Sequence, residues 1–97
     1  MANRITITDL RNSVKWANRM AGYPDDGMFY DEAEGRYLCV PGAFALDAAY
    51  GGYRLVRYAS EGGGEWVAIR RDTARNTYNA IHSYMQGWRD HEAQGEK

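Results

Sequence analysis

The sequence predicts a single α+β domain in which an antiparallel β-meander of four to five strands is flanked by an N-terminal and a C-terminal helix. Residues 42–71 hold apolar runs bounded by glycines, which is the pattern of an antiparallel meander. The segments before and after this region repeat apolar residues at helical spacing. With 97 residues, 44% of them hydrophobic, the chain can build one core. We expect the order α-β-β-β-β-β-α over residues 1–97, with both helices on one face of the sheet.

The first helix is predicted over residues 8–21. Thr8 can cap its N-terminus, with Asp9 in the first turn. Gly22 can adopt the left-handed backbone conformation that commonly ends a helix, and Pro24 follows two residues later. The apolar stripe that would face the core consists of Leu10, Val14, Ala17 and Ala21, widened by Trp16 and Met20.

A β-hairpin is predicted next. Its strands are Met28–Asp31 and Arg36–Val40, joined by residues 32–35, where Gly35 supplies a positive φ. Pro41 cannot donate a ladder hydrogen bond and should end the second strand.

The meander itself contains three further strands, separated by the glycines at 51–52 and 62–64. We predict them at Phe44–Ala49, Tyr53–Ala59 and Glu65–Arg70. Strict alternation in the last strand would place Val67 and Ile69 on one face and Trp66 and Ala68 on the other.

The final helix is predicted over residues 74–91, with Thr73 as its cap and a polar tail at about 92–97. Gly87 inside this helix indicates close packing or a slight bend. The predicted apolar stripe consists of Ala74, Tyr78, Ile81, Tyr84, Met85 and Trp88.

Charge is distributed unevenly, although the net charge is only -1. Between residues 24 and 47 only Arg36 opposes the acidic side chains of Asp25, Asp26, Asp31, Glu32, Glu34 and Asp47. Between residues 48 and 89 six arginines stand against three carboxylates. Either these segments neutralise one another in the fold, or they form an acidic lobe and a basic lobe suited to a protein partner.

No pattern of catalytic or metal-binding residues emerges. The lone cysteine, Cys39, is expected to be a small core residue, and His82 and His91 are nine positions apart on one helix and cannot share a metal. His82 is expected to be solvated or hydrogen-bonded. Asp47 is either an outward-facing strand residue or a buried partner for an arginine such as Arg54 or Arg57. A catalytic carboxylate is the least favoured interpretation, because no second acid or base is paired with it by spacing. We therefore expect a chain that is no enzyme and needs no cofactor or metal.

Aromatic residues are the most informative part of the composition. Eight tyrosines, three tryptophans and two phenylalanines exceed what a core of this size comfortably buries. Tyrosine, tryptophan and arginine dominate the energetics of protein interfaces. The expected partner-binding residues lie on the sheet and in the acidic segment: Tyr50, Tyr53, Arg54, Arg57, Tyr58, Trp66, Arg70, Arg71, Asp25, Asp26, Asp31, Glu32 and Glu34.

Two alternatives remain beside protein binding. A sheet surface rich in arginine, tyrosine and tryptophan could stack and bind nucleic acid, although no known RNA-binding motif is present and the net charge gives no support. The chain could also be a homo-oligomeric structural accessory protein, for instance a homodimer.

The stretch Leu46–Leu55, the glycines at 62–64 and the helix end Met85–Trp88 resemble a group of small, mostly uncharacterised phage and prophage accessory proteins. The pattern Asn-x-x-x-Gly-x-Pro, from Asn18 to Pro24, belongs to the same resemblance. It implies a non-enzymatic protein that binds and occludes a bacterial host or defence complex, as an anti-CRISPR-type inhibitor of a CRISPR effector does.

Location follows from the same features. A single cysteine allows no internal disulfide, and no apolar run is long enough to span a bilayer. The first residues lack the hydrophobic region of a signal peptide. We expect a cytoplasmic protein without membrane contact, located, as the resemblance implies, in the infected or lysogenic bacterial host.

Overall fold

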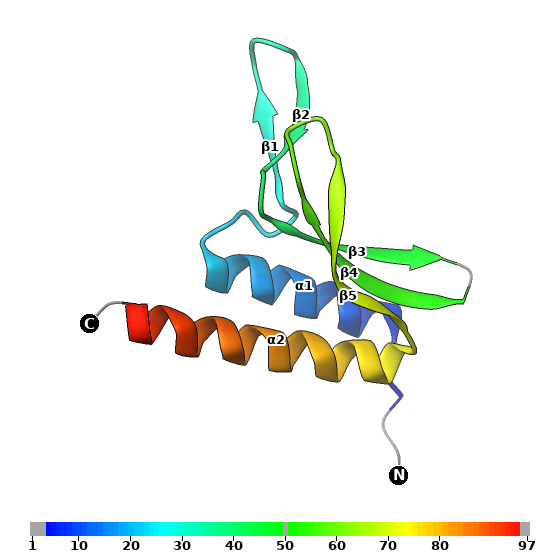
Figure 1. Cartoon of the computed structure of the whole chain (residues 1–97). Coiled ribbons are helices and arrows are strands. Elements are labelled where there is room, and N and C mark those ends of the chain that lie inside the picture. The colour runs from blue at the N-terminus through cyan, green and yellow to red at the C-terminus, as the bar shows by residue number, and fades with distance from the viewer. Residues whose placement is uncertain (1–3, 50, 96–97) are drawn as a thin grey trace.

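The computed structural model describes residues 4–49 and 51–95, with side chains up to residue 90. It confirms the predicted α+β class and element order, and it shows that the five antiparallel strands form two sheets (Figure 1). One sheet pairs β1 with β2, and the other has the order β3-β4-β5. The elements are α1 (Ile7–Ala21), β1 (Met28–Asp31), β2 (Arg36–Cys39), β3 (Phe44–Ala49), β4 (Gly52–Tyr58), β5 (Glu65–Asp72) and α2 (Ala74–Gly95).

Both helices lie side by side against one face of the three-stranded sheet, as predicted (Figure 1). Helix α1 contacts β3, while α2 contacts β4 and β5. The fully or nearly fully buried side chains that hold these layers together are Leu10, Val14, Ala17, Phe44, Leu55, Ile81 and Met85. We call this unit of two helices and three strands the body.

The start of α1 corrects the predicted cap. Thr6, and not Thr8, is the capping residue. The Thr6 hydroxyl accepts a hydrogen bond from the backbone N–H of Asp9 at 3.2 Å, and the Asp9 carboxylate accepts one from the N–H of Thr6 at 2.9 Å. This reciprocal capping box needs an acidic or amide residue three positions after the cap, which only Thr6 has. Gly22 ends the helix at φ 88°, as predicted.

Asn18 joins α1 to the first residue of β3. Its side chain is fully buried, its Oδ1 accepts from the N–H of Phe44 at 2.8 Å, and its Nδ2 donates to the C=O of Phe44 at 3.1 Å. Nδ2 also donates to the C=O of Asp25. The Asn18 amide makes the two hydrogen bonds to Phe44 that a neighbouring strand would otherwise make. These bonds fix α1 against the sheet edge.

The prediction for the faces of β5 is wrong because this strand is bulged. Leu55 pairs with Ile69 and Val56 pairs with Val67, so Ala68 is an extra residue between them. Leu55 and Val56 are consecutive and point to opposite faces, which puts Ile69 and Val67 on opposite faces as well. Accordingly Ile69 packs against the core, whereas Val67 is exposed.

Helix α2 begins as predicted and continues further than predicted. The Thr73 hydroxyl accepts a hydrogen bond from the N–H of Asn76 at 3.2 Å, and the helix extends to Gly95. A methyl group added to Gly87 would meet no neighbouring atom within 4 Å, so the expected close packing there is wrong. His82 is half-buried and lies between the rings of Trp16 and Tyr78, at centroid distances of 4.7 and 4.5 Å.

Candidate functional site

The hairpin of β1 and β2 projects from the body, and we call residues 28–39 the arm (Figure 1). Its two strands pair only with each other as a sheet. The turn at its end is fixed by Asp31, whose carboxylate accepts from the N–H of Ala33 at 2.9 Å and whose C=O accepts from the N–H of Gly35 at 2.8 Å. Gly35 has the predicted positive φ, 67°. The tip is therefore an ordered turn.

Aromatic side chains cover the outer part of the arm. Tyr30 and Tyr37 are direct cross-strand partners, and their rings meet edge to face at a centroid distance of 5.2 Å. Their exposed fractions are 52% and 62%, and Phe29 is 36% exposed. Since a two-stranded sheet that projects from the body cannot bury both of its faces, the Tyr30 and Tyr37 rings remain largely in water, whereas Phe29, on the other face, is only about one-third exposed.

The root of the arm, in contrast, is buried. Leu38 and Cys39 are less than 9% exposed, and the N–H of Cys39 donates to the C=O of Glu61, in the loop between β4 and β5. Gly27 has φ 69°, and a Cβ there would lie 3.1–3.2 Å from Ala43 and Tyr58. A residue without a side chain, glycine, is therefore required where the arm leaves the body.

The acidic residues predicted from the sequence divide between the two ends of the arm. Asp31, Glu32 and Glu34 surround the tip, where Arg36 pairs with Glu34 at 2.9 Å. Near the root, the Asp26 carboxylate accepts from the N–H of Met28. The tip therefore carries more negative than positive charge.

Asp25 belongs to the body. Arg19 of α1 binds its carboxylate through two hydrogen bonds of 2.6 and 2.7 Å, and this contact lowers the pKa of Asp25 below its ordinary value. Asp25 thus neutralises a helix cation and adds little to an acidic surface.

The sheet residues proposed from the sequence do not gather on one surface. Arg57 pairs with Phe44 on one side and with Trp66 on the other, so all three side chains face the helices. The guanidinium lies 4.7 Å from the Phe44 ring centre, 4.8 Å from Trp88 and 5.2 Å from Trp66. Its Nε donates to the C=O of Gly42 at 2.7 Å. Arg57 is consequently enclosed by rings and forms no ion pair within the described part of the chain.

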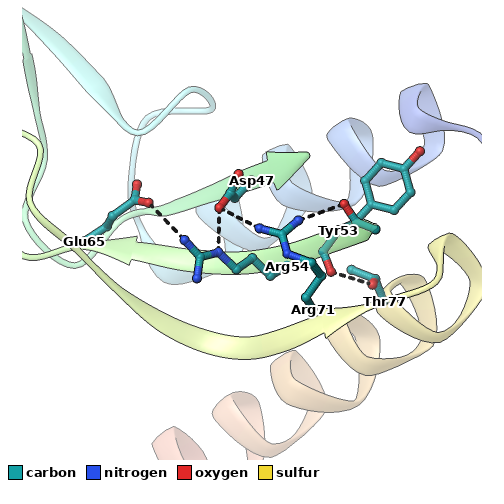
Figure 2. Close-up of polar contacts among 7 residues, drawn as sticks. Asp47, Tyr53, Arg54, Glu65, Arg71 and Thr77 are labelled. Carbon is teal, nitrogen blue, oxygen red and sulfur yellow. Dashed lines mark hydrogen bonds and ion pairs between the residues drawn. The ribbon is translucent and has the colours of Figure 1, made fainter. Parts of the chain in front are cut away.

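Arg54 and Arg71 lie on the opposite face of the sheet, where both bind Asp47 (Figure 2). The distances to Asp47 Oδ2 are 2.5 Å from Arg54 Nε and 3.1 Å from Arg71 Nη2. The hydrogen bond from Arg54 and the nearby positive charges lower the pKa of Asp47. Of the interpretations left open for Asp47, the structure shows an outward-facing strand residue that is paired with Arg54, and not with Arg57.

The remaining proposed residues have different surroundings. Tyr53 packs against the core, and Thr77 donates to its backbone C=O. Tyr58 is half-buried, and its burial, together with nearby Cys39, raises its pKa. Trp66 is 47% exposed and Arg70 is exposed. Tyr50 lies outside the described residues.

Sequence reasoning missed Phe29, Tyr30 and Tyr37. The signal was available, because the predicted hairpin register places Tyr30 opposite Tyr37. The exposure of this pair was not predicted because all five strands were expected to share one sheet, and in such a sheet one face of the hairpin would be covered.

Among the described residues there is no group of three or more His, Cys, Asp or Glu side chains that could hold a metal ion. In the same part of the chain, no helix has the length and apolar character needed to cross a membrane.

The fold and the arm thus define a small α+β protein with an exposed aromatic hairpin. Comparison with protein-family models, with curated proteins and with solved structures finds no match to this chain.

Proposed function

We propose that this chain is a non-enzymatic binding protein that uses its arm to occlude a site on another macromolecular complex. The observation that carries the proposal is the exposed Tyr30–Tyr37 pair on a hairpin with an acidic tip. In line with the phage resemblance, the complex is a bacterial defence assembly, specifically a CRISPR effector, and the chain is an inhibitor of the anti-CRISPR type.

The paired tyrosines suit a binding role energetically. Each ring can bury a large apolar area while its hydroxyl keeps a hydrogen-bonding partner, and a tyrosine loses little rotamer freedom on binding. The contact between Tyr30 and Tyr37 already restricts both rings in the free protein. The ordering cost on association is reduced accordingly.

The acidic tip indicates the kind of surface that would receive the arm. Asp31, Glu32 and Glu34 would be attracted to a groove lined with arginine and lysine, and complementary charge of this kind steers encounter and fixes orientation. Grooves that normally hold nucleic acid have this character. An arm lying in such a groove would exclude the nucleic acid, which is the steric form of inhibition.

The test uses a panel of purified CRISPR effector complexes and measures two quantities, the affinity of this protein and the binding of target DNA. We expect at least one complex to bind this protein and to lose its DNA. Replacing both arm tyrosines, Tyr30→Ser with Tyr37→Ser, should weaken that binding by about 30-fold or more, because even one hot-spot residue contributes about 2 kcal/mol or more. The unfolding midpoint should stay near that of the wild type.

Charge variants test the role of the tip. Glu32→Lys reverses an exposed charge on the arm and should slow association, most strongly at low salt. Asp90→Lys makes the same change on α2 and serves as the matched control.

Three results would contradict the proposal. The double tyrosine variant could bind the effector as well as the wild type does. An oligonucleotide could bind this protein with steep salt dependence, which would support a nucleic-acid-binding module. A stable homodimer that binds no effector in the panel would support a structural accessory protein.

A further inference from the structure

A second candidate binding surface lies along the free edge of β3 and uses no residue of the arm. Within residues 4–49 and 51–95, strand β3 pairs with β4 on one side only, and no other strand covers its second edge. At Phe44 the N–H and C=O point toward this edge, and both are hydrogen-bonded to the side chain of Asn18. Backbone groups alternate in direction along a regular strand, and β3 pairs with β4 without a bulge. The N–H and C=O groups of Leu46 and Ala48 therefore also point to the open edge.

A groove of about 240 Å³ follows this edge between β3 and α1. Its apolar lining comes from Val14, Phe44, Ala45 and Leu46. Arg11 and Lys15 of α1 also line it, and Asp25 and Asp26 lie at the end near Asn18. The groove thus combines an apolar floor, charged side chains and outward backbone groups that have no hydrogen-bond partner among the described residues.

The two groove cations, Arg11 and Lys15, form no ion pair within the described residues, although the charge of Lys15 acts on the nearby Asp25. Arg19, on the same helix, is paired with Asp25, whereas Arg11 and Lys15 are both exposed. They are four positions apart, about 6 Å along the helix axis. Side chains at positions i and i+2 of an extended strand are about 6.6 Å apart and point to the same face. An acid-x-acid sequence in a docked strand would therefore match both cations.

We propose that this groove binds an extended peptide segment with an acid-x-acid pattern, which adds a strand to the open edge of β3. The backbone of the segment pairs with Leu46 and Ala48, and its two carboxylates meet Arg11 and Lys15. A second copy of this chain is the less suitable occupant. The β3 strand of a second copy, with the sequence FALDAA, has no acid-x-acid pattern and would leave Arg11 and Lys15 unmatched.

The probe is a six-residue peptide with the sequence TEVEVT, acetylated and amidated, titrated into the ¹⁵N-labelled full chain. We expect saturable shifts of the Leu46 and Ala48 amide signals and slower hydrogen exchange of these two amides. The amides of Ala45 and Asp47, which face β4, are the internal control and should keep their exchange rates. The peptide TKVKVT should bind at least about tenfold more weakly.

Variants separate charge recognition from general charge effects. Arg11→Glu, and independently Arg11→Gln, should weaken TEVEVT binding by about five- to tenfold. Arg70→Glu makes the same change in net charge on an exposed part of β5 and should leave the affinity unchanged. Circular dichroism shows whether each variant remains folded.

The proposal fails if TKVKVT binds as tightly as TEVEVT, or if Arg11→Glu and Arg70→Glu have equal effects. A second copy would cover the edge if, without peptide, hydrogen exchange of the Leu46 and Ala48 amides slowed as the protein concentration rose and sedimentation gave the mass of a dimer. That result would also contradict the proposal. The arm variants Tyr30→Ser and Tyr37→Ser should not alter peptide binding, so this result is independent of the function proposed for the arm.

Discussion

The body and the arm differ in how far their aromatic side chains are buried. In the body, Phe44 is fully buried and makes edge-to-face contacts with Tyr23, Tyr84 and Trp88 at 5.9–6.4 Å. In the arm, Tyr30 and Tyr37 contact each other and water. The body's rings contribute to folding, whereas the arm's rings gain little from it. This difference is why we assign stability to one region and recognition to the other.

A matched pair of substitutions tests this division with the largest expected effect. Phe44→Ala should lower the free energy of unfolding by about 3–5 kcal/mol, because it leaves a cavity among Tyr23, Tyr84 and Trp88. Phe29→Ala, the same change in the arm, should cost less, about 1–2 kcal/mol, since that ring is 36% exposed and Phe44 is fully buried. Urea denaturation measures both. Equal losses would show that the arm is part of the cooperative core.

The next largest effect concerns the junction between α1 and β3. Asn18→Ala removes the partners of the Phe44 N–H and C=O at a fully buried position and should cost about 2–3 kcal/mol. Asn12→Ala, on the exposed side of the same helix, is the control and should be neutral or slightly stabilising. A cost below about 1 kcal/mol for Asn18→Ala would mean that water replaces the amide without penalty.

Two glycines of the body should respond in opposite directions. Gly87→Ala should raise the free energy of unfolding by about 1 kcal/mol, because the position is helical and a methyl group there meets no neighbour. Gly22→Ala should lower it by about 1 kcal/mol, since φ is 88° at that helix end. Thermal or urea unfolding provides the comparison. Destabilisation by Gly87→Ala would restore the view that this glycine allows close packing.

The smallest expected effect is the pH dependence contributed by Asp47. Arg54 and Arg71 lower the pKa of Asp47 in the folded state, so this carboxylate stabilises the fold above the unfolded pKa of about 3.9. That contribution is lost as the pH falls through the lower, folded pKa. The stability difference between wild type and Asp47→Asn should therefore be present at neutral pH and shrink below about pH 4. A difference that stays constant down to pH 2 would contradict this assignment.

The sequence was sufficient to predict features that depend only on residues close together in the chain, such as turns and strand bounds. Strand β3 has the predicted bounds, and Gly22 and Gly35 adopt the predicted left-handed conformations, because turns and apolar runs are local features. The choice of Thr8 as cap was also a local judgement. It failed because the reciprocal bond from Asp9 distinguishes Thr6.

The candidate site depended on features that are not local. Whether Arg57 faces water or the helices is set by which face of β4 the helices cover, and alternation alone leaves that undecided. The bulge at Ala68 put Val67 and Ile69, which were expected on one face, on opposite faces of the strand. The exposure of Tyr30 and Tyr37 followed from the separation of the arm from the main sheet, which no single segment encodes.

The buried position of Cys39 at the root of the arm provides a natural reporter. It is the only cysteine of the chain, so a thiol-specific reagent can label no other cysteine. Labelling requires either detachment of the arm or unfolding of the whole chain. If labelling in native buffer is faster than global unfolding allows, the rate measures how often the hairpin separates from the body while the body stays folded.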